Sequence, residues 1–422
     1  MEFQKIKLHR SEKNRAAVTQ ITLDDDYNVP DYRQDIVKVI KERGELRFDE
    51  VKAMEGAAWI KGSLLFKVLY RSDKQEGKIS CLRGEIPFQE RLNMDGLSEY
   101  DAVHATGDME DLTIGVINSR KLNVRAVIVL TASSEKEVDE ELTCELSDGS
   151  SYEQNIVEKE ALKLLVVRRD ICRQKSEAVL PSSKPNIREI LWQSMQLRNV
   201  ESRLVEGNIR LSGEILVSIL YNDEEEGEHL SWYETTVPLD AQAECGVMED
   251  DCIWQVQMVP LTMELEVKPD YDGEERILVM ELALDTHIRI WKEEKIRLLT
   301  DLYSLQKEVK PVFRECPLER LLVKNAAKCR MTEQMELKED KEKVLQICSC
   351  EGTVHLENTE LTGQGVRAEG ILVTELLYIT TDDQMPIGSA REIYPFEQFI
   401  EIPQQTVRTE RNKPEGPETL EQ

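Results

Sequence analysis

Histidines and cysteines are the residues best suited to acid–base, nucleophilic or metal chemistry, and here their spacing supports none of it. The five histidines show no His-x-x-x-His or His-Glu-x-x-His spacing. They are His9, His104, His229, His287 and His355. The sequence also contains no phosphate-binding loop, dinucleotide-binding fingerprint or nucleophile elbow. We therefore expect surface or core histidines, and we predict no catalytic residue, no metal site, no cofactor and no enzymatic activity.

The nine cysteines are odd in number and lack the regular spacing of a disulfide framework. This favours reduced thiols in a reducing compartment. Cys348 and Cys350 are the only close pair, and on a strand their spacing would place them on one face, which is poor geometry for a shared metal. Cys172 and Cys329 occupy the same position in an internal repeat, so we expect both to be buried structural thiols.

The formal net charge of −28 over 422 residues argues against nucleic-acid binding and against docking on an anionic membrane. Solubility is the simplest explanation of this charge, and a basic partner or divalent cations are the alternative. The acidic runs at residues 24–26, 223–226 and 382–383 are expected in loops. No apolar run approaches the ~20 residues of a membrane span, and no signal-peptide core is present. These features predict a cytoplasmic protein without membrane insertion.

One nine-residue phrase occurs three times, and it determines the architecture that we expect. It stands at residues 62–70 (GSLLFKVLY), 213–221 (GEILVSILY) and 370–378 (GILVTELLY). A proline follows each tyrosine after 17 residues: Pro87, Pro238 and Pro395. The period of roughly 155 residues is that of whole domains rather than of a solenoid. A single active site built across the whole chain is therefore not expected.

The phrase alternates as a β-strand does. In the first copy one face is apolar, ending at Tyr70, whereas the other face is mixed and includes Lys67 and Leu69. This pattern predicts a central strand of a sandwich, with the tyrosine in the core and the leading glycine at a close backbone approach. A hairpin should follow the phrase in each of the first two copies, and further strands are expected at residues 120–131 and 275–284.

Short helices are expected at residues 30–40 and 185–191. Asp31 with Gln34, and Asn186 with Glu189, have capping-box spacing directly after a proline. A single helical turn or an ordered loop is the alternative. The runs at residues 162–172 and 318–330 could be strand or helix, and their repeat context favours a strand that closes the sheet.

The predicted fold is mainly β, with tandem β-sandwich-like repeat domains and short helices. Its boundaries are residues 1–145 for the first repeat, 160–300 for the second, 316–404 for a partial third and 405–422 for a disordered tail. Closing strands missing from the third repeat would leave an open sheet edge, which this repeat must complete differently or which another segment or chain must supply.

The tryptophans of the second copy fall into two groups. Trp192 and Trp254 are expected in its core, whereas Trp232 and Trp291 lie in charged sequence and could mark a contact surface. If function depends on particular residues, we expect them where the copies differ, in loops such as 222–230 and in the third copy.

Four motifs in fixed order carry a family resemblance. They lie at residues 29–36 (VPDYRQDI), 62–70, 86–88 (IPF) and 118–127 (NSRKLNVRAV). A domain with this succession resembles the SPOCS domain, which is the repeat of SipL-like spore envelope proteins of anaerobic spore formers. The resemblance covers residues 1–404, and its three-copy organisation is similar to that of the family.

The resemblance implies a non-enzymatic adaptor in spore coat assembly. Proteins of this family bind a coat morphogenetic protein, a SpoIVA-like ATPase, on the mother-cell side of the forespore. They typically carry a carboxy-terminal LysM domain, whereas this sequence ends inside or just after the third repeat. Contacts that depend on that domain are therefore not implied for it.

Two other classes of function stay open. The repeats could be a module that binds cell-wall glycan or another polymer, although aromatic residues are only 5% of the chain and the charge is strongly negative. An enzyme would need a site inside one copy, and the tryptophan-rich second copy would be the place to look for it.

Overall fold

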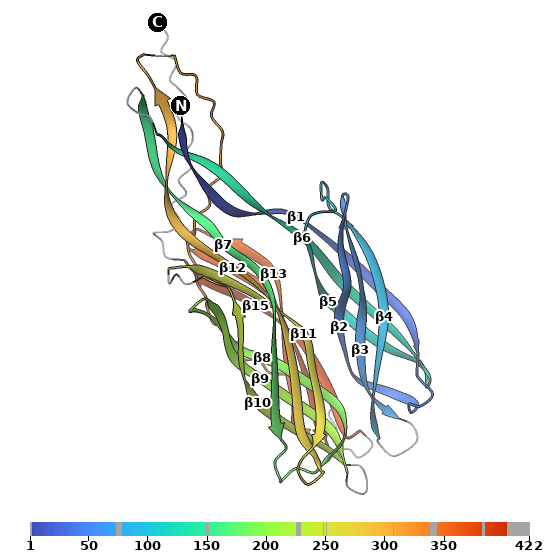
Figure 1. Ribbon diagram of the computed structural model, residues 1–422. Helices are drawn as coiled ribbons and strands as arrows, with labels where there is room; N and C mark the ends of the chain where they lie inside the picture. Colours follow the sequence, from blue (N-terminus) through green and yellow to red (C-terminus); the bar gives the residue numbers. More distant parts are fainter. Residues whose placement is uncertain are drawn as a thin grey trace.

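The computed structural model describes residues 2–72, 78–147, 152–224, 229–247, 249, 251–306, 308–337, 344–381 and 385–402. These residues form β-strands, turns and extended segments, arranged as five three-stranded antiparallel sheets (Figure 1). The mainly β prediction is confirmed.

The first six strands form a β-sandwich. Its two sheets have the strand orders β2–β3–β4 and β1–β6–β5. The strands are β1 (Phe3–Asn28), β2 (Ile36–Met54), β3 (Ala57–Ser72), β4 (Ile79–Asn93), β5 (Val103–Asn118) and β6 (Lys121–Leu146). The apolar face of β3 lies inside one core with side chains of β6 such as Ile128 and Leu130. Strand β3 is central in its sheet, as its alternating pattern predicts.

The next six strands repeat this arrangement. Their sheets have the orders β8–β9–β10 and β11–β12–β7. The strands are β7 (Glu153–Val179), β8 (Ile187–Val205), β9 (Asn208–Asp223), β10 (Leu230–Glu244), β11 (Ile253–Pro269) and β12 (Glu275–Tyr303). A second core lies between the two sheets and includes Ile215, Val217 and Ile219 of the central strand β9. The strands expected at residues 120–131 and 275–284 are thus confirmed inside β6 and β12.

The last three strands form a single sheet of order β13–β14–β15. Their bounds are Val344–Leu361, Gly365–Thr380 and Ile387–Glu401. Strand β14 holds the third copy of the repeated phrase at its centre. The residues at 318–330 form no strand, so the expectation that they close the sheet is wrong for this copy, whereas residues 162–172 do lie within β7.

The two expected helices are wrong. Residues 30–33 and 182–184 form turns, and β2 and β8 then begin at Ile36 and Ile187. From Ile36 and Ile187 onward the backbone pairs with the central strands β3 and β9, so it forms sheet rather than helix. Asp31 lies in the first turn, whereas Asn186 follows the second turn, which a hydrogen bond from the Lys184 amide to the Pro181 carbonyl closes. The acidic run at residues 24–26 is also not in a loop, since it lies within β1, paired with β6.

The glycine and tyrosine of the repeated phrase have the roles expected of them. A Cβ on Gly62, Gly213 or Gly370 would collide with a carbonyl oxygen of the neighbouring strand, so only glycine allows this approach. The tyrosines Tyr70, Tyr221 and Tyr378 are buried. The hydroxyl groups of the first two donate to backbone carbonyls, Tyr70 to Gln34 over 3.2 Å and Tyr221 to Pro185 over 3.1 Å.

Four long strands continue past the sandwiches as an arm. Strands β1, β6, β7 and β12 reach the end of the molecule where the N-terminus lies (Figure 1). Their apolar side chains form a small core of Leu8, Leu142, Ala161 and Ile296, and Leu318 packs against it. The arm joins the first two repeats and holds the start of the chain segment that leads to the third.

Candidate functional site

The three sheets that contain the repeated phrase meet around a shared core. Each sheet turns the mixed face of its central strand toward the other two. The same three repeat positions fill the core in every copy, namely Ile40, Leu191 and Cys348, then Leu69, Leu220 and Leu377, and finally Ile79, Leu230 and Ile387. The mixed face therefore packs against other repeats, whereas the fully apolar face packs inside its own repeat.

The contacts between the three sheets are cyclic. Strand β4 lies against β8, β10 lies against β13, and β15 lies against β2. Each contact joins the last strand of one sheet to the first strand of the next, so one type of interface is used three times and closes on itself. Interfaces of this head-to-tail kind form a ring when the rotation closes. We call this arrangement the three-repeat ring.

Charged residues differ between equivalent positions of the ring, and they pair across it. Lys67, Ser218 and Glu375 share one repeat position, and Lys41, Trp192 and Ser349 share another. The ammonium of Lys41, with only 4% of its side chain exposed, lies 2.8 Å from Glu375. This pair joins the first repeat to the third.

Lys67 makes the equivalent contact to the second repeat with a different chemistry. Its Nζ lies 5.0 Å from the centre of the Trp192 ring and has no hydrogen-bond partner among the described residues. A cation over an indole face is attracted by the ring quadrupole. Burial nevertheless lowers the pKa of Lys67 to about 8, because the charged form loses hydration.

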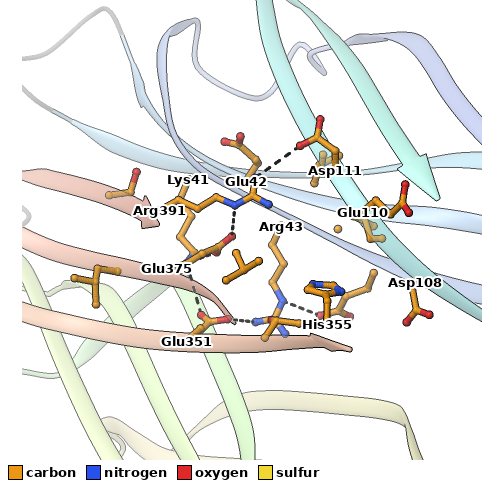
Figure 2. A pocket seen from close by; sticks show the side chains of 18 of the residues that line it. Lys41, Glu42, Arg43, Asp108, Glu110, Asp111, Glu351, His355, Glu375 and Arg391 are labelled. Atoms are coloured by element: carbon orange, nitrogen blue, oxygen red, sulfur yellow. Dashed lines mark hydrogen bonds and ion pairs between the residues drawn. The ribbon is translucent and has the colours of Figure 1, made fainter. Parts of the chain in front are cut away.

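A polar cavity of about 370 Å³ opens between the first and third repeats (Figure 2). It lies between β2 and β5 on one side and β13, β14 and β15 on the other. Seven carboxylates and three cations are among its lining residues: Glu42, Glu45, Asp108, Glu110, Asp111, Glu351 and Glu375, with Lys41, Arg43 and Arg391. The excess of carboxylates makes the cavity acidic.

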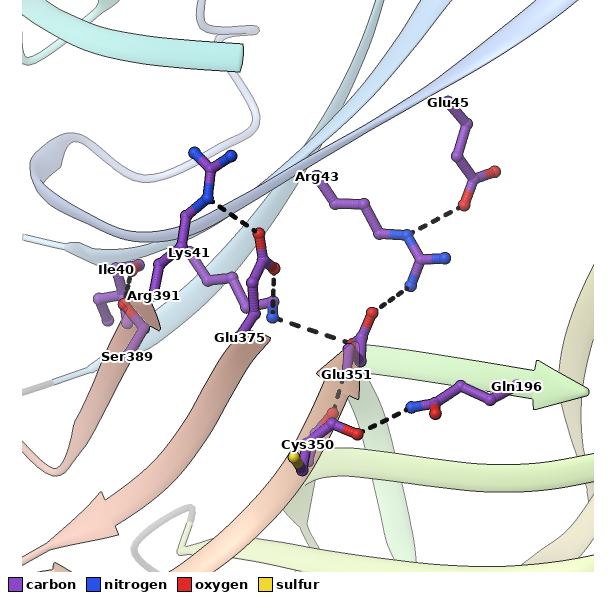
Figure 3. Close-up of polar contacts among 11 residues, drawn as sticks. Ile40, Lys41, Arg43, Glu45, Gln196, Cys350, Glu351, Glu375, Ser389 and Arg391 are labelled. Atoms are coloured by element: carbon purple, nitrogen blue, oxygen red, sulfur yellow. Dashed lines mark hydrogen bonds and ion pairs between the residues drawn. The ribbon is translucent and has the colours of Figure 1, made fainter. Parts of the chain in front are cut away.

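Ion pairs cross this cavity (Figure 3). Arg43 reaches Glu351 over 3.0 Å, and Arg391 lies 3.9 Å from Glu375 and 3.8 Å from Asp111. Burial raises the pKa of Glu42, and the neighbouring Glu375 raises it further. The Ser389 hydroxyl donates to the Ile40 carbonyl, a structural contact rather than that of an activated nucleophile. The chemistry of this cavity is therefore that of an ionic contact between repeats.

An arginine clamp explains two of the sequence motifs. The Arg120 guanidinium donates to the carbonyls of Pro30 over 2.8 Å and Arg33 over 2.7 Å, and it also reaches Asp35 over 3.2 Å. Arg276 of the second repeat binds the equivalent turn, with bonds of 2.6 Å to Pro181 and 3.0 Å to Lys184. The Val-Pro-Asp and Asn-x-Arg motifs thus meet in space as one structural device.

Two histidines that are not equivalent in sequence lie together between the first two repeats. The rings of His104 on β5 and His287 on β12 have centres 4.8 Å apart. Asp285 lies 3.8 Å from His287 and is held by Arg169. Burial lowers the pKa of both histidines. Sequence spacing gave no signal of this contact, because it joins different repeats.

The tryptophans lie partly where they were expected. Trp254 packs against the core of the second repeat, as predicted. Trp192 is buried in the shared core of the ring rather than in the core of its own repeat. Trp232, a predicted contact residue, also packs against this shared core, with Lys184 over its ring. Trp291 is half-buried on β12.

The cysteines differ from expectation at two places. Cys172 is buried, and burial raises the pKa of its thiol, whereas Cys329 is exposed because its segment forms no strand. A register shift between Ile347 and Ser349 separates the close pair, so Cys348 enters the shared core and Cys350 is exposed. The expectation that both lie on one face is wrong because a β-bulge changes the alternation.

One group of potential metal ligands occurs in the described part of the chain, at Glu249, Asp251 and Cys252. Lys292 pairs with both carboxylates, at 3.3 Å from Asp251 and in direct contact with Glu249. This ammonium offsets part of the negative charge of the cluster. Residues 225–228 of the loop at 222–230 lie outside the described residues, and so do residues 382–383 and 405–422.

Comparison with known proteins agrees with the motifs. The SipL, SPOCS domain family matches residues 35–117 of the first repeat and residues 343–412, which run through the third repeat into the segment 405–422 expected as a tail. These two segments belong to the SPOCS-domain family. Membership suggests a spore-associated role, and the SPOCS domain is not a known enzyme family. No curated protein and no solved structure matches the chain. Among the described residues we find no helix that is both long and apolar enough to span a membrane.

Proposed function

We propose that this SPOCS-domain protein is a non-enzymatic adaptor of the spore envelope. It assembles coat by binding coat morphogenetic proteins, such as a SpoIVA-like ATPase, on the mother-cell side of the forespore surface. The observation that carries the proposal is the three-repeat ring, in which three SPOCS-type sheets share one core. Such a ring fixes its outer surfaces relative to one another, which suits a scaffold that must hold partners in register.

The charge of the chain supports a particular kind of partner surface. With a net charge of −28, a partner that presents a basic patch is attracted and steered to the adaptor. Capture of such a partner should weaken as salt concentration rises, because exposed charges are screened.

The test combines capture with genetics. The tagged full chain, expressed in sporulating cells of the native host, should retain a coat morphogenetic protein, and its deletion should leave coat detached from the spore. A chain carrying Leu377→Asp, which places a charge in the shared core, serves as the disrupted control and should lose the partner. Normal, firmly attached coat in the deletion strain would overturn the proposal.

Glycan binding is measured separately by co-sedimentation with purified peptidoglycan. The proposed adaptor stays in the supernatant. Pelleting that persists at high salt would instead favour a polymer-binding module, since binding to an uncharged glycan does not depend on screened charges.

A further inference from the structure

The third repeat has an apolar sheet face that its own strands leave open. On this face of β14 lie Leu372, Thr374 and Leu376, together with Tyr378, which is buried at one end of it. All four are equivalent to core residues of the first two repeats. Leu64 and Ile215, the counterparts of Leu372, are buried under a second sheet, of order β1–β6–β5 or β7–β12–β11. Among the described residues, no second sheet covers β13 and β14.

The exposed fractions of the side chains show that the uncovered part of this sheet face is on β13. Val354 is 64% exposed and Leu356 58% exposed, and Ile347 and Leu361 are exposed as well. All four pair with residues of β14 that point to the open face, so they point the same way. We call this surface, formed by the open sides of β13 and β14, the open face.

The strand β15 is partly covered by the chain itself. The segment at residues 322–337 runs beside it, and Asn325 donates to the Glu401 carbonyl over 3.2 Å. Tyr394 of β15 is half-buried, and its pKa is raised by burial and by the nearby carboxylates of Glu392 and Glu333. This segment carries the repeat landmarks of β1 and β7, which cover the same edge in the other repeats.

The open face is almost free of charge in a highly charged chain. Asp, Glu, Lys and Arg together make up 32% of the sequence. On this side of the three strands, the register places one carboxylate, Glu392, among residues that are otherwise apolar, small or uncharged. A contiguous apolar surface of this kind marks a contact site.

We propose that the open face binds a second copy of this chain through the same face. In the first two repeats, the cover of the equivalent face is a three-stranded antiparallel sheet with one apolar side. Within the described residues, the β13–β14–β15 sheet is itself the one such sheet without a cover. Two copies related by a two-fold axis would each supply the other with this cover, because an isologous interface uses the same patch twice.

The area and the charge both allow this dimer. Two strands spaced about 4.8 Å apart and some 15 residues long, at ~3.3 Å per residue, give a face of roughly 500 Å². Two copies would bury about 1,000 Å², which is near the lower limit for a specific interface. The two chains are strongly acidic, but the open face itself carries little charge. Pairing through this face therefore brings few carboxylates close to one another. We therefore expect a reversible dimer that depends on concentration.

Sedimentation of the full chain over a micromolar concentration series tests this proposal. We expect the mass to rise from the 48.6 kDa of one chain toward twice that value. Val354→Asp should abolish the rise, because it buries a charge at the interface, and it should leave the monomer folded, because this side chain is largely exposed there. The matched control is Val18→Asp at a 65% exposed position of β1, and it should dimerise like the wild type.

A second measurement keeps the test independent of any mutation. Cys350 is exposed and pairs with Leu376, so it lies on the open face. Its alkylation should slow several-fold as concentration rises, whereas that of Cys144 in the arm should not change. A chain that stays at the mass of one copy throughout the series would overturn the proposal, and so would a dimer that Val354→Asp leaves intact. Neither result bears on the adaptor function.

Discussion

At the scale of single residues, the ring places ionisable groups where sequence reasoning predicted only a sandwich face. Lys67 stands between Leu65 and Leu69 on a mixed face, which is usual for a strand with one solvated side, and Lys41 lies on the neighbouring strand β2. Their ammonium groups are instead buried at contacts between repeats. Both ammonium groups lie over the Trp192 ring, at 5.8 Å for Lys41 and 5.0 Å for Lys67, and Lys41 also pairs with the carboxylate of Glu375, which makes the two contacts distinct. The charges thus specify which repeats meet.

Lys67 gives a prediction about pH. The pKa of this ammonium is about 8 in the folded chain, against 10.5 for an unperturbed lysine. Below pH 8 both states are protonated and the cost of burying the charge is fully present. Between pH 8 and 10.5 the unfolded chain binds more protons, so stability rises with pH. The shift limits this gain to roughly 3 kcal/mol.

Substitution isolates the effect of this charge. Lys67→Met should raise the free energy of unfolding at pH 7 by about 1–2 kcal/mol, because the lost cation–π contact offsets part of the gain. The difference from wild type should vanish above pH 10.5 or reverse. Denaturant unfolding across this pH range measures it, with Lys61→Met at an exposed position of β3 as the control. A difference that does not change with pH would contradict the assignment.

At the scale of elements, the turns before β2 and β8 show how a short motif can be misread. Proline followed by Asp with capping-box spacing, as at Pro30 and Asp31, suits a helix start and suits a turn equally well. In the second repeat the turn lies at residues 181–184, before the Pro185-Asn186 pair that was expected to start a helix. Arg120 and Arg276 lie some 90 residues further along the chain and donate hydrogen bonds to the carbonyls of these turns. These contacts stabilise a turn rather than a helix. A local pattern could not reveal a partner so distant in sequence.

The arginine clamp should stabilise the folded chain through several hydrogen bonds. Arg120→Ala leaves the carbonyls of Pro30 and Arg33 without this donor, so we expect a loss of about 2–3 kcal/mol in unfolding free energy. The matched control is Arg125→Ala, an exposed arginine of the same strand β6, with an expected change under about 0.5 kcal/mol. Equal effects of the two changes in thermal or denaturant unfolding would argue against a clamp.

The pair of Lys41 with Glu375 should differ from a surface ion pair. Glu375→Gln leaves the buried ammonium of Lys41 with only the more distant carboxylate of Glu351, at 3.9 Å, and we expect a cost of about 2 kcal/mol that changes little with salt. The control Glu45→Gln removes an exposed partner of Arg43 and should cost about 0–1 kcal/mol. Urea unfolding at low and high salt separates the two cases, and a Glu375→Gln effect that high salt abolishes would mean that the pair is solvated.

At the scale of the whole molecule, the ring explains why three copies form one body. Each sheet uses its first strand on one neighbour and its last strand on the other, so the third sheet closes the circle between the first two. The arm of long strands provides a second link between the first two repeats only. The third repeat is joined to the ring by the shared core and by the ionic cavity.

Closure predicts coupling between repeats. Leu377→Ala in the third repeat removes buried methyl groups at the shared core and should cost about 2–5 kcal/mol. Hydrogen exchange should then quicken in β2 and β9, which belong to the other repeats. The control Ile393→Ala, at an exposed position of β15, should leave exchange in those strands unchanged. Faster exchange confined to β13, β14 and β15 would show that the repeats unfold independently.

The sequence by itself determined the repeat, the central strand of each sheet, and the positions of the buried tyrosines and constrained glycines. These follow from local alternation and from collisions with the neighbouring strand, which each copy carries in its own residues. Only the tertiary structure decided that the mixed faces meet, that Lys41 pairs with Glu375, and that no second sheet of the described residues covers β13 and β14. The physical reason is that a mixed face is compatible with solvent or with another repeat. Which of the two it meets depends on residues of another repeat, such as Trp192 for Lys67 and Glu375 for Lys41.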